Sequence, residues 1–262
     1  MPGREIVFLM YHELELPGRP LCQSEPGYMR YILPVESFRS QMRWLAENGW
    51  RGLSVSEALE YPSGKNVALT FDDGCETDLI SAAPILKENG FGATLYVTAG
   101  FVGKRGYLSP IQLRELRDSG FEIGCHSMTH AYLDDVDAAG LHREVIDAGE
   151  KIEQLLGEKV AHFSCPGGRY DQRTVDLAMK ARYRSLATSR VHINSPEVNP
   201  YCLGRVPVLR RTDQGLFKRV CLGKALWWMC LSESARGAAK NVLGNAVYDE
   251  VRRLLLRYPN SG

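Results

Sequence analysis

The stretch VALTFDDG, residues 67–74, joins a short apolar run to two acidic residues and a glycine. Residues 67–71 are apolar or β-branched, and their length suits one buried strand. Asp72 and Asp73 follow this strand directly, and Gly74 suits the turn that would end it. By itself the motif leaves two interpretations open: a simple Asp-Asp-Gly turn, or a carboxylate pair that a metal ion or a proton compensates.

Similar apolar runs recur along the chain, and most are followed by amphipathic stretches with helical spacing. The expected strands are residues 5–11, 67–71, 93–97, 121–125, 161–164 and 184–188. The expected helices are a first one that carries Phe38, Met42 and Leu45 on one face, and then residues 79–88, 111–118, 141–155 and 174–181. This alternation predicts an α/β fold with a parallel sheet, and 262 residues fit one (β/α) barrel of about 250 residues. Residues 13–34 are rich in proline, glycine and charge, which predicts a long loop.

Composition narrows the class of protein. The chain is 44% hydrophobic and 24% charged, as soluble globular proteins are. Its net charge of +1 gives no electrostatic sign of a nucleic-acid partner. Seven cysteines, odd in number and without paired spacing, argue against a disulfide framework and favour a reducing compartment. Residues 1–10 lack the pattern of a secretory signal, so we expect a cytoplasmic protein.

The segment HSMTH, residues 126–130, follows the expected strand 121–125. Its two histidines are four residues apart, and they could face one centre if the segment turned helically. With one carboxylate they would form a two-histidine, one-carboxylate site, whose open positions are typical of catalytic rather than structural metals. A site for a divalent metal is therefore predicted.

The motifs TFDDG, residues 70–74, and HSMTH, residues 126–130, resemble in order and spacing those of the polysaccharide deacetylases of the NodB-homology type, carbohydrate esterase family 4. The resemblance covers roughly residues 5–210. It implies a distorted, incomplete (β/α) barrel and an enzyme that hydrolyses the carbon–nitrogen bond of N-acetylated sugars. The site residues that it implies are Asp72 as the catalytic base and Asp73, His126 and His130 as ligands of a divalent metal, by default Zn²⁺, with Co²⁺, Ni²⁺, Fe²⁺ or Mn²⁺ as alternatives.

A third motif of the family, Arg-x-Pro-Tyr-Gly, corresponds here to SCPGG, residues 164–168, so Ser164 stands where the family has arginine. In the family this arginine orients the base and pairs with an acid of a later Asp-x-x-Asp-Trp motif, which this chain lacks. Arg169 and Arg205 are candidate replacements. The resemblance also implies that the backbone N–H of Gly167 helps to hold the oxyanion.

The histidine that the family supplies as general acid near its C-terminus has no candidate after His192. The stretch LMYHE, residues 9–13, instead resembles the first-strand motif of the poly-N-acetylglucosamine deacetylase branch, which makes His12 the candidate acid. The alternative is a structural histidine at the end of a strand. In the implied mechanism the metal activates water and polarises the acetamide, Asp72 accepts a proton, the metal and Gly167 stabilise the oxyanion, and His12 protonates the departing amine.

The C-terminal part is expected to differ from the barrel. We predict a deacetylase domain over residues 1–212 and a helical extension over 213–262. From residue 205 onward the chain has eleven basic and four acidic residues, a net charge of +7. Two interpretations stay open: amphipathic helices that pack on the barrel, or peripheral contact with the anionic inner face of a membrane. The residues behind them are Trp227 and Trp228 beside Lys218, Arg219 and Lys224, and then Leu243, Val247, Val251 and Leu254 at helical spacing.

The preferred function is N-deacetylation of a sugar in a bacterial surface polysaccharide or its lipid-linked precursor. The alternatives are a deformylase or cyclic-amide hydrolase on the same scaffold, and an inactive sugar-binding homologue. The sequence leaves the oligomeric state open. Three cysteines lie in or beside the motifs: Cys75, Cys125 and Cys165. Three interpretations of them stay open: soft metal ligands, redox-sensitive thiols, or small buried hydrophobic residues.

Overall fold

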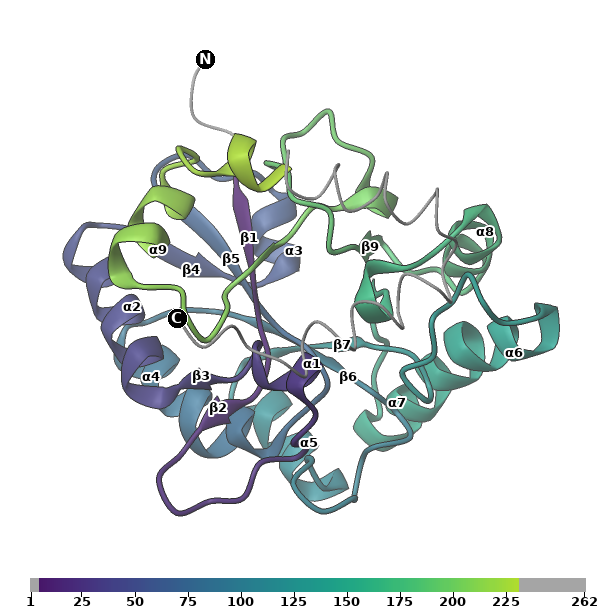
Figure 1. Cartoon of the computed structure of the whole chain (residues 1–262). Coiled ribbons are helices and arrows are strands. Elements are labelled where there is room, and N and C mark those ends of the chain that lie inside the picture. Colours follow the sequence, from purple (N-terminus) through teal and green to yellow (C-terminus); the bar gives the residue numbers. More distant parts are fainter. Residues whose placement is uncertain (1–4, 231–262) are drawn as a thin grey trace.

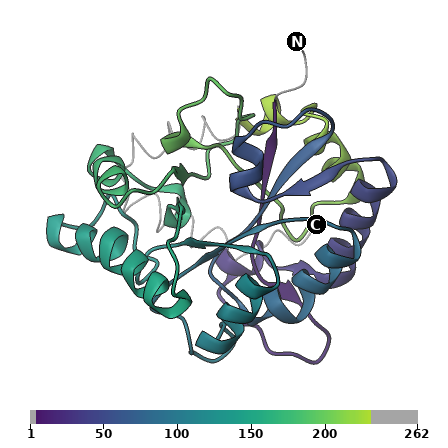
Figure 2. The ribbon, with the colours of Figure 1, turned by 180° about the vertical axis from the view of Figure 1, so that it is seen from behind.

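A computed structural model describes residues 5–230, and its centre is a curled parallel sheet (Figures 1 and 2). Every pairing between its strands is parallel. Its strands, in spatial order, are β10 (Val206–Pro207), β1 (Val7–Tyr11), β5 (Asn66–Phe71), β6 (Thr94–Val97), β7 (Glu122–Cys125), β8 (His162–Ser164) and β9 (Ser185–Ala187), with β4 (Arg51–Leu53) beside the start of β5. The six predicted strands are thus confirmed to within two residues at each end, and so is the predicted α/β class with its incomplete barrel.

Helices follow most strands and surround the sheet (Figure 1). The longer ones are α2 (Val35–Glu47), α5 (Pro110–Asp118), α8 (Gln172–Lys180) and α9 (Gln214–Cys221). The predicted helix 79–88 is a π-helical turn, η1 (Asp78–Ala82), that continues into α4 (Ala83–Glu88). The predicted helix 141–155 is α6 (Ala138–His142), η2 (Arg143–Asp147) and α7 (Ala148–Leu156) in direct succession. The short elements are α3 (Val55–Leu59), η3 (Pro166–Gly168) and η4 (Pro200–Cys202).

The sequence predicted a long loop for the segment 13–34, but the structure shows regular elements there. It contains β2 (Leu14–Glu15), α1 (Pro26–Met29) and β3 (Leu33–Pro34), and β2 pairs with β3. Elements of two to four residues are too short to produce a periodic pattern, which is why the sequence did not reveal them.

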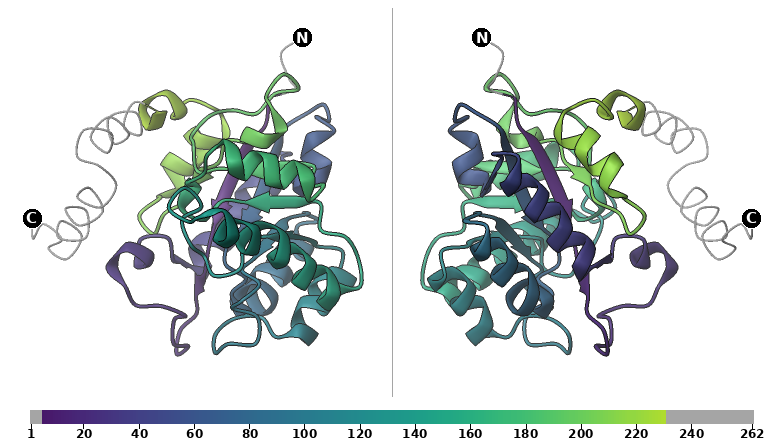
Figure 3. Two further views of the ribbon diagram at one scale, coloured as in Figure 1. Left: turned by 90° about the vertical axis from the view of Figure 1, so that its right-hand side faces the viewer. Right: turned by 90° about the vertical axis from the view of Figure 1, so that its left-hand side faces the viewer.

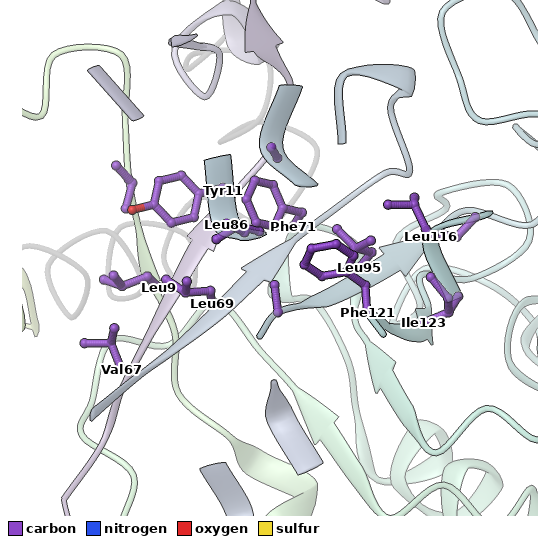
Figure 4. Close-up of a cluster of buried hydrophobic side chains, with 14 of the residues drawn as sticks. Leu9, Tyr11, Val67, Leu69, Phe71, Leu86, Leu95, Leu116, Phe121 and Ile123 are labelled. Atoms are coloured by element: carbon purple, nitrogen blue, oxygen red, sulfur yellow. The ribbon is translucent and has the colours of Figure 1, made fainter. Parts of the chain in front are cut away.

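Alternation along the strands divides the core into two layers. Leu69 and Phe71 of β5 point to the side that the helices cover, together with Tyr11 of β1 (Figure 4). Tyr11 stacks on Phe71 at 5.2 Å between ring centroids and meets Phe38 of α2 edge-on at 5.1 Å. The predicted apolar face of α2 is therefore in the core. Side chains at the alternate positions of these strands, such as Phe8, point to the other face of the sheet and belong to a second cluster inside the barrel.

The barrel is bridged where its two edge strands approach. Leu203, shortly before β10, accepts a hydrogen bond from the N–H of Thr188 at 2.9 Å and donates its own N–H to Leu186 of β9 at 3.0 Å. Arg205 lies two residues after Leu203. The bridge therefore carries the Arg205 side chain into the interior, where it is fully buried.

Helix α9 packs on α2 at the flank of the barrel, with Phe217 meeting Trp44 edge-on at 6.0 Å (Figure 3). It belongs to the predicted C-terminal extension, and the predicted helical residues Leu243, Val247, Val251 and Leu254 lie outside the described residues. Among residues 5–230, no helix has the length and apolar character needed to span a bilayer.

Candidate active site

The site lies where β1, β5 and β7 end at one edge of the parallel sheet. His12 follows β1, Asp72 and Asp73 follow β5, and His126 follows β7. The sheet hydrogen bonding continues past the strands: the N–H of Asp72 donates to Tyr11 at 3.0 Å, and that of His126 donates to Val97 at 2.8 Å. The backbone therefore fixes the positions of these side chains, as is usual for sites at the carboxyl ends of parallel strands.

Asp73, His126 and His130 converge although more than fifty residues separate the carboxylate from the histidines. Oδ1 of Asp73 lies 3.5 Å from Nε2 of His126 and 3.4 Å from Nε2 of His130. The same Oδ1 is buried and has no hydrogen-bond partner among the described residues. A buried carboxylate oxygen without a partner is costly unless a cation compensates it, so this donor set fits a divalent metal.

The ring of His126 is oriented by a backbone contact. Its Nδ1 lies 2.9 Å from the carbonyl oxygen of Ser164, which requires Nδ1 to carry the proton and to donate it. Nε2 therefore keeps a free lone pair on the side of Asp73. Burial lowers the pKa of His126 to about 4, so the imidazole is neutral near pH 7, as a metal ligand must be.

His130 reaches the site without the helical turn that the sequence predicted. Ser127 and His130 both have left-handed backbone angles, with φ of 67° and 64°, and residues 126–130 form no helix. The Ser127 hydroxyl accepts the N–H of His130 at 3.0 Å. The buried carboxylate of Glu144, from η2, accepts two backbone N–H groups of this loop and the hydroxyl of Thr129 at 2.7 Å. Side-chain hydrogen bonds, not helix geometry, thus bring the two rings together.

Asp72 forms a bidentate ion pair with Arg205. Nη1 of Arg205 donates to Oδ1 at 2.7 Å, and Nη2 donates to Oδ2 at 2.8 Å and to the Ser164 hydroxyl at 2.8 Å. Both side chains are buried. Burial alone would raise the pKa of Asp72, but the charge and hydrogen bonds of Arg205, together with His126 and His12, lower that pKa well below the ordinary value. Arg169 and Arg205 were the two candidate replacements for the family arginine. The structure places Arg205 at the carboxylate of Asp72.

Arg169 is engaged elsewhere, at the rim of the site. Its Nε donates to Asp134 at 2.8 Å, and its guanidinium lies 4.3 Å from the centre of the Tyr132 ring. The same ring packs against Gly167, where a Cβ atom would come within 2.7 Å of it. Gly167 is exposed on the turn after β8 with φ of 59°, a conformation that favours glycine.

His12 lies beside the converging groups and packs on Tyr31, with 4.7 Å between ring centroids. Its Nδ1 is buried and has no hydrogen-bond partner among the described residues. Burial lowers the pKa of His12 below its ordinary value, and the charges of Asp73 and Asp72 offset this lowering only in part. A histidine held for structure alone would be expected to use both ring nitrogens, so the free Nδ1 favours the functional interpretation.

The chain is similar in sequence to known proteins. The sequence profile of the family described as polysaccharide deacetylase matches residues 60–186. The poly-beta-1,6-N-acetyl-D-glucosamine N-deacetylase of Staphylococcus aureus is 32% identical over 208 residues, which cover 72% of each chain. The chain belongs to the polysaccharide deacetylase family. It is thus a hydrolase of carbon–nitrogen bonds, as the two motifs predicted.

One further relative agrees with this family, and one solved structure shares the fold. The peptidoglycan-N-acetylglucosamine deacetylase of Bacillus cereus is 27% identical over 126 residues, which cover 48% of this chain and 57% of that protein. The deacetylase PplD of Streptococcus pyogenes, solved in complex with acetate, shares the fold with a TM-score of 0.73 at 24% identity, over 83% of this chain and 98% of that one. The closer likeness to the branch with an N-terminal Tyr-His motif stays a prediction.

Two residues that position the site of this polysaccharide deacetylase were not found from its sequence. Glu144 lies beside the apolar stripe of a helix, yet it is fully buried. Ser164 replaces the arginine of the family motif, but its carbonyl orients His126 and its hydroxyl contacts Arg205. A charged residue beside the buried stripe of an amphipathic helix is the one signal that could have revealed Glu144.

Proposed function

We propose that this polysaccharide deacetylase removes acetyl groups with a divalent metal, Zn²⁺ by preference, held by Asp73, His126 and His130. The observation that carries the proposal is the convergence of one unpartnered carboxylate oxygen and two imidazole nitrogens at the carboxyl edge of the sheet. Such a set leaves coordination positions open for water and substrate. When bound, the ion would polarise the acetamide carbonyl and acidify a water molecule.

The protein's own groups supply the remaining chemistry. Asp72 is ionised and oriented by Arg205, and its Oδ2 lies 3.8 Å from Nε2 of His126, so it faces the site. In the proposed role Asp72 accepts the proton of the attacking water, and the N–H of Gly167 donates to the oxygen that becomes negatively charged. The carbon–nitrogen bond then breaks, and His12 gives a proton to the amine that leaves.

The proposed substrate is an N-acetylated sugar of a bacterial surface polysaccharide or of its lipid-linked precursor, and the Staphylococcus aureus relative supports the polysaccharide part. We further propose action in the cytoplasm, with peripheral contact at the anionic inner face of the membrane. Trp227 and Trp228 support this contact, since 54% and 63% of their surfaces are exposed in a basic part of the chain.

Acetate release from monomeric, oligomeric and lipid-linked N-acetylated sugars tests the activity, with bound metal measured on the same samples. We expect Asp72→Asn to keep the metal and to lose nearly all turnover, and His126→Ala to lose both. His12→Gln should keep the metal and slow the turnover of substrates with poor leaving groups. Asp72→Asn protein without metal would contradict the division of roles. Release of formate from the matching N-formylated sugars, with no acetate from the N-acetylated ones, would contradict the substrate class.

A further inference from the structure

A second cluster of metal-ligating side chains lies beside the candidate active site. We propose that Glu13, Cys22 and Cys75 bind a second ion, Zn²⁺ or a similarly soft divalent metal, which ties the N-terminal segment to the active-site loop. A carboxylate oxygen of Glu13 and the two sulfur atoms lie within 4.8 Å of one another. Glu13 follows His12 directly, and Cys75 is two residues after Asp73, so such an ion would join the two loops that carry these side chains.

The spacing of the sulfur atoms suits a shared ion. The Sγ atoms of Cys22 and Cys75 are 3.6 Å apart, and both cysteines are free. A tetrahedral zinc with Zn–S bonds of about 2.3 Å places two sulfurs about 3.8 Å apart. A disulfide would need about 2.05 Å. The two thiols are thus already near the separation that coordination demands.

The carboxylate of Glu13 is held in place toward the thiols. Both of its oxygens accept the backbone N–H of Cys22, at 3.0 and 3.1 Å, and the residue is only 1% exposed. The thiol of Cys22 donates a hydrogen bond to the carbonyl oxygen of Gly106 at 3.0 Å. This oxygen is a further potential metal ligand at the cluster. Three chain segments therefore bring donor atoms to one point, and the backbone contact orders the carboxylate in advance.

A buried carboxyl group without a hydrogen-bond partner adjoins the cluster. Asp78 is fully buried, and neither of its oxygens has a hydrogen-bond partner among the described residues. The N–H of Asp78 donates to the carbonyl oxygen of Cys75 at 3.0 Å, so this residue directly contacts one of the proposed ligands. A buried carboxyl group without a hydrogen-bond partner is unfavourable, and a divalent ion beside it would reduce that cost.

The donor set determines which ion fits. Two thiolates and a carboxylate suit Zn²⁺, whereas Mg²⁺ and Ca²⁺ prefer oxygen ligands alone. The site of Asp73 and the two histidines carries no sulfur, so the two sites have different spectroscopic signatures. This inference stands apart from the proposed catalysis, because its test is metal binding and not turnover.

The first experiment uses Co²⁺ in the full chain with His126→Ala and His130→Ala, in a phosphine-reduced buffer. We expect about one Co²⁺ per chain to remain bound, with a near-ultraviolet sulfur-to-metal charge-transfer band. Adding Cys22→Ser or Cys75→Ser should abolish the band, and the matched control Cys202→Ser should leave it unchanged. Absence of the band in the double-histidine variant, or its survival in Cys22→Ser, would overturn the proposal.

The second experiment needs no variant and so does not depend on how a mutant folds. Cys22 and Cys202 are both half-buried, and each can be alkylated with iodoacetamide and counted by peptide mass. Free Zn²⁺ at ten times its Kd should slow the alkylation of Cys22 by about tenfold, and a chelator should reverse this. Cys202 should react at the same rate throughout. Equal rates for Cys22 with and without Zn²⁺ would refute the second site.

Discussion

Replacing Arg205 by methionine tests the ion pair on which the geometry of Asp72 depends. Methionine keeps much of the side-chain volume but removes the guanidinium, which donates to both oxygens of Asp72 from a fully buried position. Removing one partner of a buried pair leaves an uncompensated charge and costs about 3–5 kcal/mol of unfolding free energy. For a chain of this size we expect the Tm to fall by roughly 6–20 °C.

The same change should alter catalysis through Asp72. Without the cation, the lowering from Arg205 is lost while burial still acts on the carboxyl, so the pKa of Asp72 rises from its lowered value. Activity that needs ionised Asp72 is lost as pH falls through that pKa, so the acidic limb of the kcat/KM profile should move to higher pH. Arg205→Lys, which keeps the charge but not the fork, should show a smaller shift.

Matched variants separate this effect from general damage. Arg39→Met removes an arginine that pairs with Glu88 at 3.2 Å on the surface, and it should change stability by about 0–1 kcal/mol. The double variant Asp72→Asn, Arg205→Met should lose less unfolding free energy than the sum of the two single variants, because it leaves no unpaired buried charge. The reasoning would be refuted if the unfolding free energy of Arg205→Met lay within about 1 kcal/mol of that of the unchanged protein. An acidic limb of the kcat/KM profile that does not move would also refute it.

Three further predictions concern stability. Burial would raise the pKa of Glu122, but the hydrogen bond and charge of His162, with hydrogen bonds from Ser56 and Thr94, lower that pKa to about 2, below the ordinary 4.5. Its contribution of about 3 kcal/mol to the free energy of unfolding is therefore present above pH ~4.5 and disappears as pH falls toward 2. Urea unfolding at several pH values should therefore show a flatter acid dependence in Glu122→Gln, and an unchanged slope would contradict this. Gly124→Ala would place a Cβ 2.4 Å from the ring of Tyr96, so we expect a loss of about 1–3 kcal/mol in thermal unfolding, and a Tm equal to that of the unchanged protein would count against it. Ser54→Ala removes the side-chain cap of α3 and should cost about 1 kcal/mol, visible as faster amide exchange in that helix but not in α5.

The sequence by itself determined six strands of the central sheet and the side chains at their ends, but not β4 or β10. Residues 67–71 and 121–125 are apolar runs of strand length, and the parallel arrangement brings their carboxyl ends to one edge. Asp72, Asp73 and His126 occupy the first positions after those runs. Local pattern was sufficient here because strand length and the following residue are properties of one short segment, and the alternation of strands with helices along the chain implies parallel pairing.

Only the tertiary structure decided which distant groups complete the site. Arg205 is 133 residues from Asp72, and nothing local distinguishes it from the other arginines of the chain. The fold selects it because Leu203 bridges to β9 and carries the side chain into the interior, where an unpaired charge would be too costly. The loop of His130 depends in the same way on Glu144, since its conformation is fixed by hydrogen bonds across the fold and not by the preferences of its own residues.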